Sequence, residues 1–250
     1  VDDYKSYDTE KLRKHFLIET IFAADDVLFT YTHYERLMVG GAMPIQTAVK
    51  LETVEQLKSE YFLQRRELGA INIGGSGKIS VDGEVFNIDT KEALYIGRGA
   101  KDVIFTSDDS SNPAKFYLNS TPAHCSYPTK KVNKENSKVL HMGAGDTCNE
   151  RDIYQLMIST VLDTCQLQMG MTELKPGSIW NTMPMHTHSR RMEAYFYFNI
   201  PDTHAVCHFM GPAEETRHIW VGNEQAVVSP PWFLNAGVGT ENYTFIWGMA

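Results

Sequence analysis

Two histidines and a glutamate stand close together in the second half of the chain, at His186, His188 and Glu193. In an extended strand, side chains two positions apart share a face, so the two imidazoles point to one side. A turn over residues 189–192 brings the Glu193 carboxylate back towards this histidine pair. Two neutral nitrogens and one carboxylate suit zinc, manganese, iron or nickel and leave positions open for water or substrate. The spacing therefore predicts a metal site.

The alternative for this stretch is ordinary surface chemistry, with two solvated histidines and Glu193 paired with an arginine. A lone His-x-His favours that alternative, because the spacing is common. The added glutamate and the alternating aromatic run behind it, residues 194–198, favour a metal site, either functional or ancestral.

The elements that position these residues are predicted to be strands. From about Val27 onward, short β-rich runs alternate with Gly, Asn, Asp and Pro, and residues 81–84 (Val-Asp-Gly-Glu) predict a hairpin. Many short strands separated by turns favour an all-β sandwich or barrel. Ahead of them, the segment 8–10 is expected to cap a short helix over Lys11–Ile18 that packs on the outside of a sheet.

Composition restricts the function classes. The 250 residues are 42% hydrophobic and 22% charged, as in a globular protein with a sizeable core. With 23 basic and 31 acidic residues, the net charge of −8 provides no basic surface for nucleic acid or an anionic membrane. We therefore expect a small-molecule partner, and an anionic one would need local arginine or lysine.

Compartment and thiol chemistry follow from what the sequence lacks. Residues 1–6 have no apolar secretory core, and no apolar run is long enough to span a bilayer, which predicts a cytoplasmic protein. The four cysteines lie far apart without a Cys-x-x-Cys pair, so we expect free thiols, with Cys165 and Cys207 as core filler.

The two halves of the chain resemble each other. Residues 61–73 align with residues 186–198, and residues 92–97 align more loosely with residues 224–230. The histidines and the glutamate of the second half fall on Tyr, Leu and Leu in the first, which predicts a first half without metal. Chance similarity between two β segments is the alternative. The predicted parts are an arm (1–28), a metal-free barrel (29–120), a connector (121–160) and a metal-binding barrel (161–250).

The pattern His-x-His, four residues, Glu resembles the first metal-binding motif of the cupins, which are small antiparallel β-barrels with one metal inside. The position that often carries Gly in that motif is Ile200 here. Their second motif, Pro-x-Gly-x-x-His, is similar to the segment that starts at Pro230, with Trp232 at the Gly and Asn235 at the His. The resemblance implies a bicupin of two jelly-roll barrels. It also places Asn235, a weaker zinc donor than imidazole, at the fourth ligand position.

Over nearly its full length the chain resembles one cupin family, the 5-keto-4-deoxyuronate isomerases, also called 4-deoxy-L-threo-5-hexosulose-uronate ketol-isomerases. The matching segments include residues 43–45, 61–75, 113–117, 122–124, 127–131, 164–167, 180–184, 186–188, 190–193, 215–218, 223–226 and 243–248. The resemblance implies an intramolecular oxidoreductase of the aldose-ketose type. Its reaction interconverts 5-dehydro-4-deoxy-D-glucuronate and 3-deoxy-D-glycero-2,5-hexodiulosonate in pectin breakdown, in a homohexamer. It also implies zinc bound by His186, His188 and Glu193, with Asn235 at the fourth position.

Moving a carbonyl along a sugar requires a group that transfers a proton, and the substrate carboxylate requires a cation. Tyr195 and Tyr197 share the strand face of Glu193 and are candidates for the proton transfer, with aromatic wall as the alternative. The candidate carboxylate-binding residues are Arg190, Arg191 and Arg217. At least one of these arginines is expected to form a structural ion pair. Three further histidines, His204, His208 and His218, are expected to be structural or surface residues.

Two other function classes stay open at this point. Because Asn235 replaces a histidine, the protein could be a metal-poor bicupin that binds sugars or has a structural role. Two histidines and one carboxylate are also the ligand set of non-haem iron oxygenases, which suggests a cupin dioxygenase. Metal content and oxygen consumption separate these classes from the isomerase.

Overall fold

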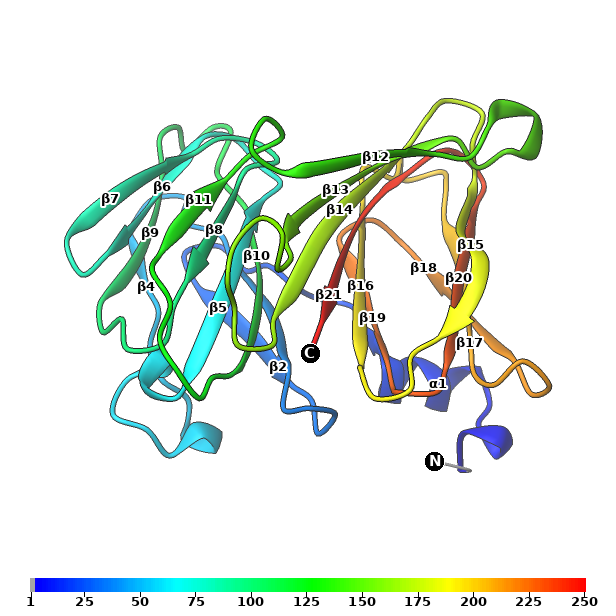
Figure 1. The fold of residues 1–250 in the computed structure, drawn as a ribbon, viewed down its shortest axis with the longest axis horizontal. Helices are drawn as coiled ribbons and strands as arrows, with labels where there is room; N and C mark the ends of the chain where they lie inside the picture. The colour runs from blue at the N-terminus through cyan, green and yellow to red at the C-terminus, as the bar shows by residue number, and fades with distance from the viewer. Residues whose placement is uncertain (1–2) are drawn as a thin grey trace. The chain divides into compact units, whose positions relative to one another are not determined.

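The computed structural model describes residues 3–250, which divide into two compact units (Figure 1). The N-terminal unit comprises Ile21–Lys138 and Gln155–Met169, together with Ala250. The C-terminal unit comprises the residues up to Thr20, Val139–Tyr154 and Gly170–Met249. The predicted arm, residues 1–28, thus supplies its described residues up to Thr20 to the C-terminal unit. The predicted connector, residues 121–160, supplies residues to both units.

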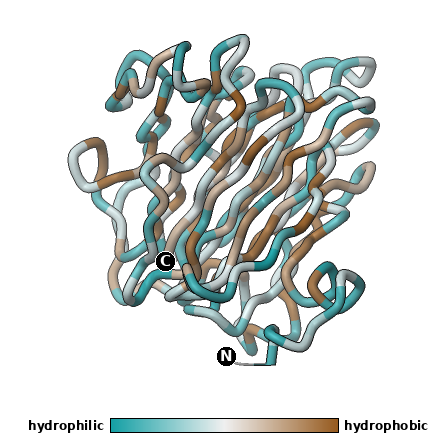
Figure 2. The backbone as a smooth tube through the Cα atoms, turned by 90° about the vertical axis from the view of Figure 1, so that its right-hand side faces the viewer, coloured by the Kyte–Doolittle hydropathy of each residue, from teal (hydrophilic) through white to brown (hydrophobic). Residues whose placement is uncertain are grey.

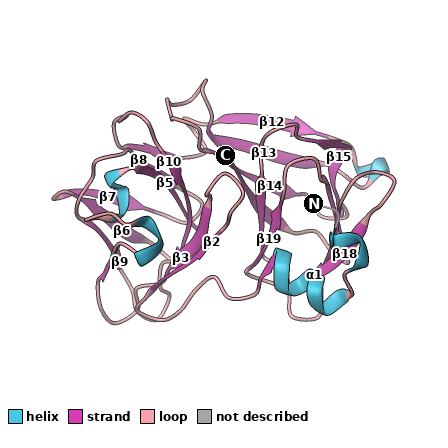
Figure 3. Cartoon of the chain, turned by 90° about the horizontal axis from the view of Figure 1, so that it is seen from below, coloured by secondary structure: helices cyan, strands magenta, loops and turns pink. Residues whose placement is uncertain are grey.

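Helical segments are few and short (Figure 3). The α-helix α1 (Thr9–Phe16) begins after Asp8, whose carboxylate accepts a hydrogen bond from the Lys11 amide at 2.9 Å, as an N-cap does. The predicted N-terminal helix is confirmed. It ends two residues before the predicted Ile18, because Leu17 and Ile18 leave the helix as strand β1 (Leu17–Ile18). Within residues 3–250, four 3₁₀ turns complete the helical content: Asp3–Ser6, Glu55–Leu57, Phe62–Gln64 and Gly145–Thr147.

The N-terminal unit is built from two antiparallel sheets. The larger one has six strands, in the order β11 (Lys130–Val132), β8 (Ala93–Ile96), β5 (Arg66–Asn72), β10 (Phe116–Pro122), β3 (Met38–Ala42) and β2 (Val27–Tyr31). The smaller one has four, in the order β4 (Val49–Lys50), β9 (Val103–Ser107), β6 (Gly77–Val81) and β7 (Glu84–Ile88). Every residue of the central strand β5 is buried.

The core of this unit lies between its sheets. Phe116 of β10 meets Phe105 of β9 with ring centroids 5.4 Å apart, and both side chains are fully buried. The predicted hairpin is confirmed between β6 and β7, where Val81 pairs with Glu84. Its two central residues, Asp82 and Gly83, have φ values of 49° and 91°, which Asp tolerates and Gly adopts without cost.

The C-terminal part of the chain forms the other two sheets. The seven-stranded sheet has the order β1, β19 (Gln225–Ser229), β16 (Glu193–Phe198), β21 (Thr244–Met249), β14 (Gln168–Leu174), β13 (Arg151–Met157) and β12 (Lys138–Met142). The four-stranded sheet has the order β15 (Trp180–Thr187), β20 (Leu234–Gly239), β17 (Val206–Met210) and β18 (Arg217–Val221). Helix α1 contacts β18 and β19, and its Phe16 ring lies 6.0 Å from the Phe233 ring.

The strands that the predicted duplication aligns occupy equivalent places in their sheets. Strand β5 lies between β8 and β10, and β16 lies between β19 and β21. In both units the central strand is continuously buried, which is expected for a strand covered on both faces. Hydrophobic and hydrophilic stretches alternate along the extended segments, and many of the outer loops are hydrophilic (Figure 2).

The all-β class of the prediction is confirmed. The four sheets are open in their hydrogen bonding, so the count of two closed barrels stays a prediction. No helix within residues 3–250 is long and apolar enough to cross a membrane.

Candidate active site

The inward face of strand β16 carries three polar residues in a row. Glu193, Tyr195 and Tyr197 alternate with apolar neighbours, so they share one face of the seven-stranded sheet. All three are buried, and the Tyr195 hydroxyl donates a hydrogen bond to Glu193 Oε2 at 2.7 Å. The two phenol rings stack at 6.4 Å. Burial, followed by the neighbouring Glu193 charge, raises the pKa of Tyr195 well above its usual value, so this phenol stays protonated.

His188 is the partner of this carboxylate from the other side. Its Nε2 lies 3.1 Å from Glu193 Oε2, and its side chain is 23% exposed against 6% for Glu193. The turn over residues 189–192 thus returns Glu193 to His188, as the sequence predicts. The His186 ring meets the His188 ring edge-on at 5.1 Å, but His186 is exposed and its Nδ1 lies 3.0 Å from the Pro184 carbonyl oxygen.

His208 joins the site from the four-stranded sheet. This residue of β17 is fully buried, and its Nδ1 lies 2.7 Å from the Tyr197 hydroxyl. Its ring also lies 5.2 Å from the Tyr195 ring, so β16 and β17 face each other across the interior of the unit. Burial lowers the pKa of His208 to about 3, with Asn235 acting in the opposite direction. The imidazole is therefore neutral at neutral pH.

Several buried polar atoms of this unit have no hydrogen-bond partner within the described residues. They are His208 Nε2, Asn235 Oδ1, Ser229 Oγ and Tyr243 Oη. Ser229 pairs with Glu193 in the sheet register, and Asn235 pairs with His186, so these atoms belong to the faces already described. Buried polar groups are normally satisfied by protein, water or ligand. An interior with this many unpaired groups is suited to a polar ligand.

Gly237 makes room for this arrangement. It pairs with His208 in the register of β17 and β20. A Cβ atom at Gly237 would lie 3.0 Å from the Tyr243 hydroxyl and 3.1 Å from the Tyr197 hydroxyl. A side chain at this position would press on both phenols.

The three predicted carboxylate-binding arginines lie away from these atoms or at the surface. Arg217 donates hydrogen bonds to the Lys5 and Thr216 carbonyl oxygens and forms an ion pair with Glu215 at 2.8 Å. Arg190 and Arg191 are exposed in the turn between β15 and β16. The structure leaves the roles of all three as predictions.

Arg151 is a guanidinium that the sequence reasoning missed. It is 3% exposed and donates to the Asn149 and Met183 carbonyl oxygens at 2.7 and 3.0 Å. Its Nε has no partner within the described residues, and the guanidinium interacts with the neighbouring Tyr243. Burial lowers its pKa, which is expected for a cation without a buried carboxylate beside it.

The predicted zinc ligands fit a metal in part. His188 and Glu193 present a nitrogen and a carboxylate oxygen side by side, and Asn235 presents a buried oxygen without a partner. His186 lies on the strand beside Asn235 but holds its imidazole at the surface. The donor chemistry of these four residues suits a divalent cation, and their role as ligands stays a prediction.

Another group of potential ligands lies in the N-terminal unit. The ligand atoms of His124, Cys125 and Cys165 all lie within 4.8 Å of one another. The expected free thiols are present at all four cysteines, and Cys207 is buried as core filler. Cys165, in contrast, is only half-buried. Sequence spacing gave no signal for the group, because Cys125 and Cys165 come from distant segments.

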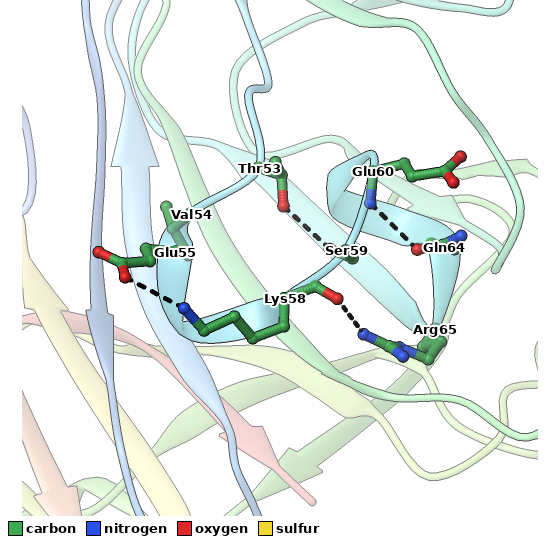
Figure 4. Close-up of a pocket in the computed structure, with 8 residues that line it drawn as sticks. All are labelled: Thr53, Val54, Glu55, Lys58, Ser59, Glu60, Gln64 and Arg65. Atoms are coloured by element: carbon green, nitrogen blue, oxygen red, sulfur yellow. Dashed lines mark hydrogen bonds and ion pairs between the residues drawn. The ribbon is translucent and has the colours of Figure 1, made fainter.

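The open groove in Figure 4 has a structural explanation. Its volume is about 490 Å³, and it is lined by residues 53–55, 58–60, 64 and 65 of the N-terminal unit. Its guanidinium, Arg65, donates to the Leu57 and Lys58 carbonyl oxygens at 2.8 and 2.7 Å. Lys58 pairs with Glu55 at 3.0 Å. Both cations of this groove, Lys58 and Arg65, thus interact with residues of the same loop.

Comparison with known proteins decides the family. The model of the KduI/IolB family matches residues 17–250. The chain belongs to the KduI/IolB family. A relative from Formosa agariphila, named 4-deoxy-L-threo-5-hexosulose-uronate ketol-isomerase, is 58% identical over 98% of this chain and 88% of its own length. Relatives with the same name from Yersinia pestis and Bacteroides fragilis are 56% and 55% identical, each over 99% of this chain and 90% and 89% of theirs.

Solved structures of low sequence identity share the fold of this chain. An IolB-like protein from Salmonella typhimurium superposes with a TM-score of 0.75 at 12% identity, over 94% of this chain and 92% of that one. The oxalate decarboxylase of Lactobacillus farciminis gives a TM-score of 0.60 at 12% identity, over 85% and 76%. The predicted family and the predicted cupin-type fold are both confirmed. The chain is an enzyme of the isomerase class, an intramolecular oxidoreductase.

Proposed function

We propose that the chain is a zinc-dependent ketol-isomerase that interconverts 5-dehydro-4-deoxy-D-glucuronate and 3-deoxy-D-glycero-2,5-hexodiulosonate in polyuronide breakdown. The observation that carries the proposal is the identity of 58% and 55% to relatives with that isomerase name, over nearly the whole chain. The buried polar interior of the C-terminal unit supports it, because a sugar acid offers hydroxyl, carbonyl and carboxylate groups to unpaired protein atoms.

Arg151 is the proposed partner of the substrate carboxylate. A guanidinium has five N–H donors, and Arg151 directs two hydrogen bonds to backbone carbonyls. The donors that remain belong to a buried cation without an acid partner within residues 3–250. An anionic ligand would offset the free-energy cost of burying the Arg151 charge. The planar guanidinium would also fix the orientation of a carboxylate.

Tyr195 is the proposed proton-transfer group, and Glu193, a proposed zinc ligand, accepts its hydrogen bond and orients the hydroxyl. An aldose-ketose isomerisation removes a proton from the hydroxyl-bearing carbon and returns a proton to the neighbouring carbonyl carbon. The Tyr195 hydroxyl and Glu193 Oε2 are 2.7 Å apart and both residues are buried, so the phenol proton is directed at the carboxylate oxygen. His188 Nε2 holds the same carboxylate oxygen from the other side.

His208 is the proposed group that stabilises the enediolate oxygen. When the Tyr197 hydroxyl donates to His208 Nδ1, the neutral ring carries its proton on Nε2, beside the Asn235 side chain. This N–H can donate to a developing negative oxygen of the substrate. His186, His188, Glu193 and Asn235 would hold the zinc. When bound, zinc supplies Lewis-acid polarisation of the carbonyl.

The test is an isomerisation assay on the unsaturated uronate, with and without a chelator. Glu193→Gln should lower kcat by about a hundredfold or more, because it removes the carboxylate that His188 and Tyr195 share. Glu241→Gln is the matched control, since Glu241 lies 3.3 Å from His204 in an exposed His–Glu pair. Wild-type turnover that survives the chelator would contradict the proposed zinc dependence. Equal turnover of the Glu193→Gln and Glu241→Gln variants would contradict a catalytic role for Glu193.

A second candidate is a metal-poor bicupin that binds sugars, favoured by Asn235 at the place of a ligand histidine. Elemental analysis of purified wild type and the Asn235→His variant separates the two. Stoichiometric zinc in wild type that disappears in His186→Ala supports the isomerase. Zinc found only in Asn235→His supports the sugar-binding protein.

The remaining parts of the proposal are a cytoplasmic location, a small-molecule uronate substrate and a homohexamer. The net charge of −8 supports the absence of nucleic acid and anionic membrane partners. Light scattering on the purified chain measures the assembly, and a mass of six chains is the expected result.

A further inference from the structure

The thiols of Cys125 and Cys165 lie next to each other in the N-terminal unit. Cys125 follows strand β10, and Cys165 precedes strand β14. Their sulfur atoms are 3.4 Å apart, and a ring nitrogen of His124 lies within 4.8 Å of both. Both cysteines are half-buried, and His124 is exposed. A dissolved cation therefore has access to the group.

The distance between the sulfur atoms suits two ligands of one metal better than it suits a disulfide. A disulfide bond is about 2.05 Å long. Two sulfurs at about 2.3 Å from a tetrahedral zinc lie about 3.8 Å apart. The separation of 3.4 Å differs from the metal geometry by a few tenths of an ångström and from the bond by far more.

The backbone that carries Cys165 is held rigidly from behind. The fully buried Glu67 carboxylate accepts hydrogen bonds from the amides of Cys165, Gln166 and Leu167 at 2.8–2.9 Å. The Tyr95 hydroxyl donates to the same carboxylate at 2.7 Å. The backbone at Cys165 is thus held in place before any ligand binds, which lowers the entropic cost of binding.

The segment that carries His124 and Cys125 is held as well. Arg98 donates to the Ala123 and His124 carbonyl oxygens, both at 3.1 Å. The Gln166 side chain donates to the Pro122 carbonyl oxygen at 2.9 Å and so ties the two segments together. Such supporting hydrogen bonds behind the ligands are typical of metal sites.

The Cys165 thiol has both an acceptor and a donor beside it, and its Sγ donates to the Cys125 carbonyl oxygen at 3.2 Å. The Cys125 amide donates to Cys165 Sγ at 3.4 Å, and an N–H donor stabilises a negative sulfur. Burial raises the pKa of the Cys165 thiol, so the group is protonated when nothing is bound. A cation would replace the thiol protons, and the Glu67 carboxylate behind the site would add to its attraction.

We propose that His124, Cys125 and Cys165 form a second metal site, which binds one thiophilic divalent cation of the zinc class. Two thiolates and one imidazole supply three ligands, and water completes the tetrahedron. Binding releases the two thiol protons to solvent and changes no oxidation state. The site lies in the unit that the sequence predicts to be free of metal, and it is independent of the isomerase proposal.

Cobalt(II) titration of the metal-free protein tests the proposal, because thiolate ligands produce a charge-transfer band that nitrogen and oxygen ligands do not. We expect the band in wild type and in His186→Ala, whose substitution affects only the first site. Cys125→Ser should abolish the band, and His124→Ala should weaken cobalt binding by about tenfold or more. Cys148→Ser, at an exposed free thiol, should leave the band unchanged.

Other outcomes would overturn the site. Absence of the band in wild type excludes thiolate ligation of cobalt. A band that survives Cys125→Ser, or that disappears in Cys148→Ser, assigns the ligands elsewhere. Intact-mass analysis without reductant adds a check, since a Cys125–Cys165 disulfide in the protein as purified would point to a redox pair instead. Loss of isomerase activity in Glu193→Gln with the band retained would show that the two proposals stand separately.

Discussion

The phenols of Tyr195 and Tyr197 face the same interior but have different partners. Tyr195 donates to Glu193, whereas Tyr197 contacts the neutral His208. Replacing Tyr195 by Phe removes the shared proton, so we expect kcat to fall by roughly a hundredfold, with a smaller change in KM. Tyr197→Phe leaves His208 Nδ1 unpaired and should lower kcat by about tenfold through misorientation of the ring.

Steady-state kinetics on both variants measures this difference, with Tyr31→Phe in the N-terminal unit as the control. Unchanged turnover in both variants would show that the two tyrosines only line the interior and take no part in catalysis.

At this scale the sequence reveals residues that share a strand face. The alternation of β16 predicts that Tyr195 lies beside Glu193, and the turn at 189–192 predicts the contact with His188. The roles of His208 and Arg151 could not be predicted from the sequence, because a single histidine or arginine in an apolar strand looks the same whether it is structural or functional. The contact between Cys125 and Cys165 could not be predicted either, since only the folded chain brings these distant segments together.

Glu67 shows how one side chain joins strand β5 to a distant loop. Its carboxylate binds three consecutive amides of residues 165–167. Glu67→Gln replaces an acceptor by an N–H donor that faces other donors, which leaves buried groups unsatisfied. We expect the free energy of unfolding to fall by about 3 kcal/mol. Urea unfolding measures it against Glu84→Gln on the exposed strand β7, where less than about 0.5 kcal/mol is expected.

Strands β12 and β13 are joined by a charged contact. Asp152 of β13 lies 2.6 Å from His141 Nδ1 of β12 and also binds Lys175, with a side-chain exposure of 10%. Burial alone would raise the pKa of the Asp152 carboxyl, but the hydrogen bonds from Lys175 and His141 outweigh it and lower this pKa. The ionised carboxylate therefore stabilises the fold above the ordinary carboxyl pKa, and this contribution is lost as the pH falls through the lowered value.

Asp152→Asn should thus lower the free energy of unfolding by on the order of 1 kcal/mol near neutral pH, a small effect because the partners Lys175 and His141 are partly or largely exposed. In strong acid, where the carboxyl is protonated, the variant and the wild type should be equally stable. Thermal unfolding of wild type and variant as a function of pH measures the difference, with Asp202→Asn as an exposed control. A gap between wild type and Asp152→Asn that widens towards acid would contradict this prediction.

Individual helices and hairpins could be predicted from the sequence more accurately than the pairing of distant strands. The helix cap at Asp8 and the hairpin at Asp82-Gly83 depend on local residues, and both were predicted correctly. The end of helix α1 was predicted too late, because pairing of Leu17 and Ile18 with β19 outweighs their helical tendency. Local patterns contain no information about a partner strand in the second half of the chain.

For the whole molecule, the two units differ in how the chain builds them. Each unit draws on more than one stretch of the chain, but β5 and β10 of the N-terminal unit both lie in the continuous stretch Ile21–Lys138, whereas β1 and β19 of the C-terminal unit come from two widely separated stretches. Contacts between distant residues form slowly, because loop closure must precede them. In pulse-labelling hydrogen exchange during refolding, the amides of β5 and β10 should gain protection before those of β1 and β19. Simultaneous protection of all four strands would argue for one cooperative unit.

The pairing of Leu17 with Val227 has a consequence for biosynthesis. A ribosome delivers β1 long before β19, which leaves the exit tunnel some two hundred codons later. During that interval the hydrophobic side of α1, with Leu12 and Phe16, has no β19 to cover it. Translation speed and chaperone occupancy, rather than final stability alone, should then govern the yield of correctly assembled protein in the cell.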